Sequence, residues 1–334
     1  MEKYKNMLKN KTVKTVYFGG GTPPLIGSKY LNQILEKIKS DFNISNKMEI
    51  SLEANPNSVT KEMLCELTDG GFNRISFGVQ SSNPHELKLL GRTHTARDAA
   101  QAVFWAREAG FENVSIDLMI GTPDQTVDNL LRSIDFATAL DVTHISAYIL
   151  KIEEGTLLSK ARYALDIPDD DEQADYYLAT VQALSDAGYA QYEISNFAKK
   201  GMECAHNLIY WNGEEYLGLG PSAHSFVGDE RFCYESNLNK FINNSKNNDR
   251  VVSVNDSGGD LEEYIMLRLR LNEGVVYEKL EDRFYFPANV KNRLQKKAKE
   301  LVKHLLCTSD DQGIRLTTKG FLLSNYCTSY LLGI

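Results

Sequence analysis

The chain has 334 residues, of which 25% are charged and 42% are hydrophobic, as in ordinary globular proteins. Its net charge of −8 argues against general nucleic-acid binding, which depends on many Lys and Arg contacts to phosphates. No apolar run approaches the ~20 residues of a membrane span, and the first residues contain no secretory-type apolar segment, so we expect a cytoplasmic protein.

From the start to about residue 150, short β-branched runs alternate with helical segments. Strands are predicted at residues 14–18, 49–52, 74–79, 114–120 and 144–150, and helices at 30–40, 61–70, 97–110 and 128–140. Strands that alternate with helices of this length are typical of parallel β/α units. The strands are mostly apolar along their length, which predicts a sheet buried on both faces.

Glycine and polar residues gather where the apolar runs stop, at 19–22, 53–55, 80–82 and 121–123. In parallel β/α proteins, ligands bind at these carboxyl ends of strands. One such loop alone is explained by turn geometry, whereas plain turns do not need Glu, Gln and Asp in succession. The series therefore favours a ligand site.

The loop at residues 19–24 reads GGGTPP, which is not the G-x-G-x-x-G pattern of dinucleotide-binding turns. Pro23 and Pro24 prevent a helix from starting within the glycines, so a helix N-terminus cannot hold a pyrophosphate there. We expect instead a backbone edge that accepts the amino or carboxyl group of a ligand.

The second half of the chain begins with an acidic N-cap, DIPDDDEQ, and a helix to about residue 186. A tyrosine-rich strand (188–198) follows. Residues 243–260 are predicted to be a polar linker between domains 1–242 and 261–334. The last segment reads helix, helix, β-wing, helix, which predicts a winged-helix-like α+β domain. It has little positive surface beyond KNRLQKKAK, so we expect no nucleic-acid partner.

The ordered motifs FGGGTPP, SLEANP, FGVQS, LLGRTHT, IDLMIGTP, YEISNFA and GLGPSAHSF resemble the oxygen-independent coproporphyrinogen III oxidase family of radical S-adenosylmethionine (SAM) proteins. No single motif is decisive, but the ordered set is specific and covers nearly the whole chain. The resemblance implies an α/β fold, namely a partial (β/α) barrel of radical SAM type with a winged-helix-like C-terminal domain. The family's cofactors are SAM and a 4Fe–4S cluster.

The resemblance also implies residue roles at the first two strand ends. Gly20, Gly21 and Thr22 are candidates to offer backbone to the methionine amino end of SAM. Glu53 resembles a carboxylate that hydrogen-bonds SAM, and the competing interpretation is an exposed loop acid.

Three further SAM contacts are implied beyond these strands. Gln80 resembles a polar contact, although a turn-capping amide is the alternative. Arg92 matches a guanidinium that pairs with the SAM carboxylate, for which the planar fork of Arg suits well, and a surface arginine is its alternative. Asp117 resembles the ribose-binding acid, and an acid inside an apolar strand needs a partner in any case.

Residues 204–211 read CAHNLIYW and match an H-N-x-x-Y-W signature that resembles the heme-chaperone (HemW) branch more than the true oxidases. By resemblance, His206 is the candidate heme contact and iron ligand, with Asn207, Tyr210 and Trp211 beside it. A histidine ahead of flat rings suits a porphyrin. The alternative interpretation of His206 is a hydrogen-bonded loop histidine.

Two other residues of this half of the chain are not favoured as iron ligands. Cys204 is an alternative iron ligand, but a buried, inert thiol is the preferred interpretation. His224, in SAHSF, resembles a shared structural position.

The five cysteines, Cys65, Cys204, Cys233, Cys307 and Cys327, are dispersed and form no C-x-x-C. Such a set indicates reduced thiols. The family's C-x-x-x-C-x-x-C is also missing, and the strand bearing GGGTP, the second in the family, comes first here. We therefore expect an N-terminally truncated barrel with no catalytic residues of its own, in which the strand at 14–18 forms a sheet edge that favours association, for example as a homodimer.

The sequence thus predicts a heme-chaperone-like scaffold that binds heme and SAM and passes heme to an acceptor protein, but is catalytically silent as given. The alternative is an oxygen-independent coproporphyrinogen III oxidase acting in porphyrin biosynthesis. A nucleotide-binding enzyme without iron is the third and weakest reading. The expected partners are heme or a porphyrin, an unknown heme acceptor and, peripherally, a membrane surface.

Overall fold

The computed structural model describes residues 2–161, 165–246 and 254–333. The chain divides into two compact units, Met1–His206 and Asn207–Ile334.

The first unit is built on a seven-stranded sheet with the order β1-β2-β3-β4-β5-β7-β6. Neighbouring strands from β1 to β5 are parallel, and β5, β7 and β6 pair antiparallel. The strands are β1 (Thr12–Phe18), β2 (Asn43–Ala54), β3 (Arg74–Gln80), β4 (Asn113–Ile120), β5 (His144–Ile149), β6 (Ala190–Glu193) and β7 (Asn196–Ala198). The predicted tyrosine-rich strand is thus two short strands.

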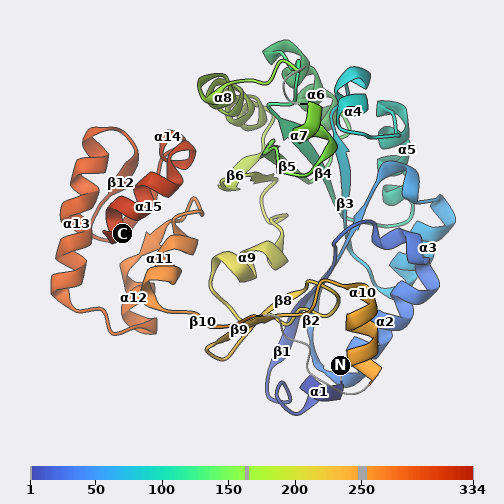
Figure 1. The fold of residues 1–334 in the computed structure, drawn as a ribbon, viewed down its shortest axis with the longest axis horizontal. Coiled ribbons are helices and arrows are strands. Elements are labelled where there is room, and N and C mark those ends of the chain that lie inside the picture. Colours follow the sequence, from blue (N-terminus) through green and yellow to red (C-terminus); the bar gives the residue numbers. More distant parts are fainter. Residues whose placement is uncertain (1, 162–164, 247–253, 334) are drawn as a thin grey trace. The chain divides into compact units, whose positions relative to one another are not determined.

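Helices connect the parallel strands, and Figure 1 shows α2, α3 and α5 along the outer side of the curved sheet. The connecting helices are α2 (Ser28–Asp41), α3 (Lys61–Gly70), α4 (Pro84–Leu89), α5 (Ala96–Glu108) and α6 (Val127–Ala139), with 3₁₀ turns η1 (Pro23–Ile26) and η2 (Pro56–Ser58). Helix α1 (Glu2–Lys5) precedes β1, and α7 (Leu157–Ala161) and α8 (Asp170–Asp186) lie between β5 and β6. The four helices predicted from the sequence correspond to α2, α3, α5 and α6. This arrangement confirms the predicted partial (β/α) barrel.

The sheet is apolar on one face only, which differs from the prediction. Leu52, Ile75 and Ile116 are buried and lie on the side that packs against the helices. Because successive residues of a strand point to opposite faces, the residues between them lie on the inner face. These inner-face side chains are polar, and neighbouring strands bond across that face, as from Ser76 to Asp117. The half-barrel therefore carries a polar lining.

β1 lies at one edge of this sheet. An edge strand presents unpaired backbone groups to other chains, so the expected self-association of this chain remains a prediction for size-exclusion chromatography. No helix among the residues described is both long and apolar enough to cross a membrane.

The second unit begins within α9 (Ala205–Trp211) and contains a three-stranded antiparallel sheet of order β10-β9-β8. Its strands are β8 (His224–Val227), β9 (Glu230–Cys233) and β10 (Val254–Ser257), and α10 is Leu238–Lys246. The predicted linker at 243–260 is therefore only partly irregular, since it includes the end of α10 and all of β10. Residues 247–253 of it lie outside the described residues. The predicted domain limits stay a prediction.

The C-terminal elements follow the order helix, strand, helix, helix and two strands, which confirms a winged-helix-like domain. They are α11 (Leu261–Arg268), β11 (Val275–Val276), α12 (Tyr277–Arg283), α13 (Ala288–Lys303), β12 (Cys307–Ser309), β13 (Gly313–Leu316), α14 (Thr318–Leu322) and α15 (Ser324–Leu332). β13 pairs antiparallel with β11 and β12. The predicted β-wing is β12, β13 and their turn.

The acidic stretch before α8 forms the predicted N-cap. Asp169 Oδ1 accepts a hydrogen bond from the Glu172 N–H at 2.9 Å, and the Glu172 side chain accepts one from the Asp169 N–H at 3.0 Å. This reciprocal pair is a capping box, which satisfies two backbone donors at the start of the helix.

We predict that Asp169→Ala lowers the free energy of unfolding by about 1 kcal/mol, because it removes the cap acceptor. Asp171→Ala is the matched control: it removes the same charge from the same turn but leaves the capping box intact. Urea unfolding of both variants measures the difference. Equal losses of unfolding free energy in the two variants would show that the negative charge, rather than the capping hydrogen bond, stabilises the start of α8.

Candidate functional site

The loop after β1 is shaped by three glycines that serve different purposes. Gly20 and Gly21 have φ angles of 81° and 85°, which side-chain-bearing residues rarely adopt. At Gly19, an added Cβ would lie 2.8 Å from the ring of Tyr17 and 3.1 Å from the carboxyl carbon of Glu53. The glycines thus let bare backbone pass close to these two side chains.

Glu53, at the end of β2, holds this loop with both carboxylate oxygens. Its Oε1 accepts a hydrogen bond from the Tyr17 hydroxyl at 2.8 Å, and its Oε2 accepts one from the Gly20 N–H at 3.2 Å. Burial and the charge of Glu53 raise the pKa of the Tyr17 phenol, so Tyr17 stays protonated and acts as the donor. We call residues 19–21 and Glu53 the strand-end shelf.

Arg92 is joined to the loop through Asn55. Its Nη1 donates to Asn55 Oδ1 at 3.0 Å, and Asn55 Nδ2 donates to Thr22 Oγ1 at 3.0 Å. The Nε of Arg92 is buried without a hydrogen-bond partner in the described structure. Leaving a buried donor unpaired is costly, so the guanidinium is suited to an acceptor brought by a ligand.

Gln80 ends β3 in a backbone conformation that is uncommon for a residue with a side chain, with φ of 69°. Its Nε2 lies 3.0 Å from the position that a Cβ on Gly78 would occupy, so the amide folds back over Gly78. Gly78 is in register with Asp117 on β4. Uncommon backbone geometry of this kind often occurs at binding sites.

Asp117 has the partners expected of a buried acid. Ser76 donates a hydrogen bond to Asp117 Oδ1 at 3.0 Å. Burial raises the pKa of Asp117, while hydrogen bonds from Ser146 and Ser76 act in the opposite direction.

The structure places the predicted SAM contacts at or near the carboxyl ends of β1 to β3, except for Asp117, which lies inside β4 in register with Gly78, and Arg92, which reaches Asn55 from the loop after α4. The predicted contacts are Gly20, Gly21, Thr22, Glu53, Gln80, Arg92 and Asp117. Their assignment to SAM stays a prediction.

His206 lies on the inner face of the first unit and is fixed in three ways. Its Nδ1 shares a hydrogen bond of 2.8 Å with the Thr15 hydroxyl. Its ring stacks on Tyr17 with the ring centroids 4.9 Å apart and the planes 21° from parallel. The carboxylate of Glu49 accepts hydrogen bonds from the Ala205 and His206 N–H groups at 2.9 Å and 3.0 Å. We call Thr15, Tyr17 and Glu49 the His206 seat.

Burial, and to a smaller extent the charge of Arg74, lowers the pKa of His206 to about 4. The imidazole is thus neutral near pH 7, which is the form that can bind a metal. A metal here would have to be bound through Nε2, because Nδ1 is engaged by Thr15. Metal-binding histidines commonly hold their second nitrogen in such a hydrogen bond.

Beneath His206 lies Arg74, whose side chain is only 3% exposed. Burial opposes its charge, but Cys204, Glu49 and Tyr17 favour the charged form, and the pKa of Arg74 is raised. Cys204 is fully buried with its Sγ 3.7 Å from Glu49 Oε1, which agrees with its interpretation as an inert thiol.

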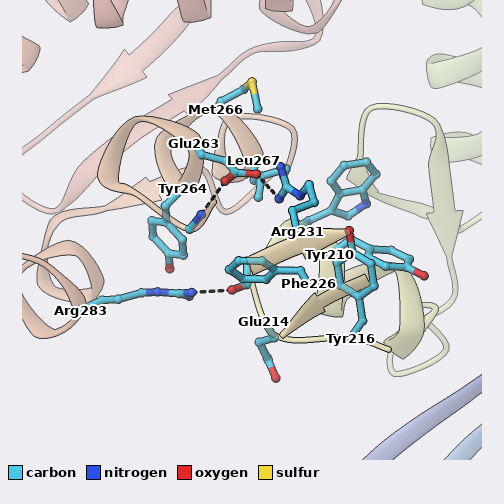
Figure 2. A pocket seen from close by; sticks show the side chains of 13 residues that line it. Tyr210, Glu214, Tyr216, Phe226, Arg231, Glu263, Tyr264, Met266, Leu267 and Arg283 are labelled. Atoms are coloured by element: carbon cyan, nitrogen blue, oxygen red, sulfur yellow. Dashed lines mark hydrogen bonds and ion pairs between the residues drawn. The ribbon is translucent and has the colours of Figure 1, made fainter. Parts of the chain in front are cut away.

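Tyr210 and Trp211, the last residues of the H-N-x-x-Y-W signature, line a cavity of about 380 Å³ in the second unit. Figure 2 shows their neighbours Tyr216, Phe226 and Tyr264 around this cavity. His206 is not among the lining residues. Asn207 is half-buried on α9.

Three arginines pack against the aromatic rings of this cavity. Arg270 lies 4.4 Å from the Trp211 ring centroid, and Arg283 lies 4.7 Å from that of Tyr264. Arg231 is paired with Glu263, as the dashed line in Figure 2 shows. The cavity therefore combines flat aromatic surfaces with charges of both signs, since Glu214 and Glu263 also line it. His224, which was set aside as a ligand, is exposed on β8.

The donor set that a 4Fe–4S cluster needs does not occur among the described residues. All five cysteines are described; Cys65 is half-buried and the others are buried. No group of three or more His, Cys, Asp or Glu side chains in the described part of the chain is arranged to hold a metal ion. We therefore derive no chemical step through a cluster.

Comparisons with known proteins agree with this fold. The Radical SAM superfamily model matches residues 1–137, and the HemN C-terminal domain model matches residues 260–323. Coproporphyrinogen III oxidase (HemN) from Escherichia coli, described as a radical SAM enzyme, has a similar structure with a TM-score of 0.84. That match covers 99% of this chain and 80% of the enzyme at 22% identity, and it shows the fold alone. Fold and family model thus define a radical SAM protein.

Curated relatives show to which family of radical SAM proteins the chain belongs. The chain is 33% identical to the heme chaperone HemW of Lactococcus lactis over 94% of its own length and 83% of the relative's. It is 34% identical to HemW of Bacillus subtilis over 96% and 86%. Radical S-adenosyl methionine domain-containing protein 1 of Danio rerio, a mitochondrial protein, is 33% identical over 93% and 73%. The chain belongs to the HemW family of radical SAM proteins.

Four inner-face residues that shape the site were not among the predicted site residues: Thr15, Tyr17, Glu49 and Arg74. Each stands at an alternate position of a β-branched run. The signal that would have found them is the two-residue period of polar side chains along strands that the sequence predicts to be mostly apolar.

His144, on the inner face of β5, makes the first unit sensitive to acid. Its Nδ1 bonds with Ser115 and its Nε2 with Tyr192, both at 2.8 Å. Burial lowers the pKa of His144 well below its usual value of 6.5. Below about pH 6.5 the unfolded chain binds a proton that the folded chain excludes, so stability falls as the pH falls.

We predict that His144→Gln flattens the dependence of unfolding free energy on pH between about 6.5 and 5, by at most about one proton per chain. Chemical unfolding at several pH values gives the two slopes. Taking the difference between variant and parent removes the contributions of other groups, such as the buried His94. Parallel slopes would contradict the assignment.

Proposed function

We propose that this chain binds heme and transfers it to an acceptor protein. Its curated relatives carry the name heme chaperone HemW. The observation that carries the proposal is the His206 seat, which fixes a neutral imidazole in a signature shared with that branch. A histidine that only filled space would not need its ring nitrogen, ring face and backbone all to be held.

The proposed heme contacts are His206 as the iron ligand, with Asn207, Tyr210 and Trp211 as further parts of the signature. Neutral imidazole is a common axial ligand of heme iron, and aromatic rings suit a porphyrin face. Thr15 would orient the imidazole, as hydrogen-bonded partners of metal-binding histidines do.

We further propose that the strand-end shelf and its neighbours bind SAM. The residues fit this ligand, because the unpaired Nε of Arg92 is suited to the carboxylate of SAM. Gly20 and Gly21 also present bare backbone, with no atom within 4 Å of where a Cβ would project. Asp117, between Ser76 and Ser146, is the proposed ribose contact.

Three wider assignments are also part of the proposal: a cytoplasmic location, a heme acceptor that contacts this chain directly, and peripheral contact with a membrane surface. Nucleic acid is not among the proposed partners, given the net charge of −8.

We predict that His206→Ala weakens hemin binding at least about tenfold, since even loss of a supporting hydrogen bond at a metal site costs 10- to 100-fold. Absorbance titration in the Soret region measures the affinity. His224→Ala, which removes an exposed histidine of the second unit, is the matched control and should bind as the parent does. If hemin causes no Soret change with the parent chain, the chaperone proposal is wrong. If the parent chain and His206→Ala bind hemin with equal affinity, His206 is not a heme contact.

We predict that Arg92→Met weakens SAM binding about tenfold or more, because hydrogen bonds to charged groups contribute about 1.5–3 kcal/mol. Isothermal titration with SAM measures the affinity. Arg97→Met is the control, because it removes an exposed guanidinium of α5. If both variants bind SAM as the parent does, the assignment of Arg92 is wrong.

A further inference from the structure

Tyr17 touches both parts of the proposed site. Its hydroxyl donates to Glu53 Oε1 at 2.8 Å, and its ring stacks on the imidazole of His206. Glu53 in turn accepts from the Gly20 N–H. The Tyr17 side chain thus links the strand-end shelf to the imidazole of His206, entirely within the first unit.

We propose that Tyr17 is a positioning residue that couples these two parts, so that engagement of Glu53 by a ligand on the shelf changes how tightly His206 binds heme. The inference rests on the proposed heme-binding function and adds to it a regulation of the same site. Because binding couplings are reciprocal, heme at His206 would equally change the affinity of the shelf for its ligand.

The contacts leave Tyr17 little freedom to absorb a change at Glu53. The phenol remains protonated, and its one hydrogen is directed to Glu53. When Glu53 turns toward a ligand, the Tyr17 hydroxyl loses its acceptor. Because a donor shielded from water is costly to leave unpaired, the hydroxyl must then turn to another acceptor. A turn of the phenol changes the stacked face against which His206 rests.

The backbone at Gly19 packs closely against the side chains of Tyr17 and Glu53. A Cβ at this position would come 2.8 Å from the Tyr17 ring and 3.1 Å from the Glu53 carboxyl group, so the loop backbone closes over the hydrogen bond between them. Close-packed groups pass displacements on, because there is no empty space to take them up.

His206 cannot simply follow the ring, since Thr15 holds its Nδ1 and Glu49 holds its backbone N–H. A shift of Tyr17 therefore changes the stacking contact itself. The altered stacking between Tyr17 and His206 would change the affinity of His206 for heme.

The test is a double-mutant cycle on hemin affinity with Tyr17→Phe and Glu53→Ala. Tyr17→Phe keeps the ring and its stack but removes the hydroxyl. We expect Glu53→Ala to change hemin affinity about threefold or more in the parent, a size usual for coupled neighbours, and to have no effect in Tyr17→Phe. Equal effects of Glu53→Ala in both backgrounds would overturn the proposal, as would no effect in the parent.

Tyr189→Phe is the matched control. It removes another buried phenol hydroxyl of the same unit, one that donates to the Val142 carbonyl at 2.6 Å and has no recorded contact with Glu53. Glu53→Ala should change hemin affinity as much in this background as in the parent. Glu53→Gln serves as a second variant of similar shape should Glu53→Ala fail to fold.

A second readout separates this proposal from heme binding itself. The imidazole NMR signals of His206, assigned by their loss in His206→Gln, are recorded without heme for the same four proteins. A shift on Glu53→Ala that disappears in Tyr17→Phe supports the coupling even if hemin does not bind, in which case only the heme function fails. Additive shifts in the four proteins would overturn the coupling whatever hemin does.

Discussion

The structure of the first unit depends on the alternation of side chains along five parallel strands. One face of each strand is apolar and packs against helices, and the other face is polar and curves inward. Polar groups on such a face must find partners, since burying them unpaired is costly. The site follows from that requirement. Tyr17 and Glu53, Ser76 and Asp117, and Ser115 and His144 are all cross-strand pairs on the inner face.

This constraint also explains how one short helix is placed. The N-terminal end of α9 has backbone N–H groups without partners in its own helix. Glu49, an inner-face residue of β2, accepts two of them and so sets the position of His206. A carboxylate at a helix N-terminus is also favoured by the helix dipole. The same acid lies near Arg74, which keeps opposite charges together inside the unit.

Much of the fold was predictable from local patterns. The alternation of β-branched runs and helical segments gave the parallel β/α units, and glycines such as Gly71, with a φ of 104°, marked helix ends correctly. The position of Glu53 at the end of a strand, and of Asp117 inside one, followed from the same pattern. The stacking of His206 on Tyr17 was not predictable, because the residues are far apart in sequence and meet only where the start of α9 is held against the inner face by Glu49. The polar inner face was missed because β-branched neighbours hid its two-residue period, and the helix and strand within residues 243–260 were hidden by polar composition.

The central claim is that the imidazole of His206 is the protein ligand of heme iron. Electron paramagnetic resonance of the ferric hemin complex, prepared with ¹⁵N-labelled histidine, tests this most directly through the hyperfine coupling of a bound nitrogen. We expect coupling to an imidazole nitrogen in the parent chain and its loss in His206→Gln. The same coupling in both proteins would contradict it, since another histidine would then hold the iron.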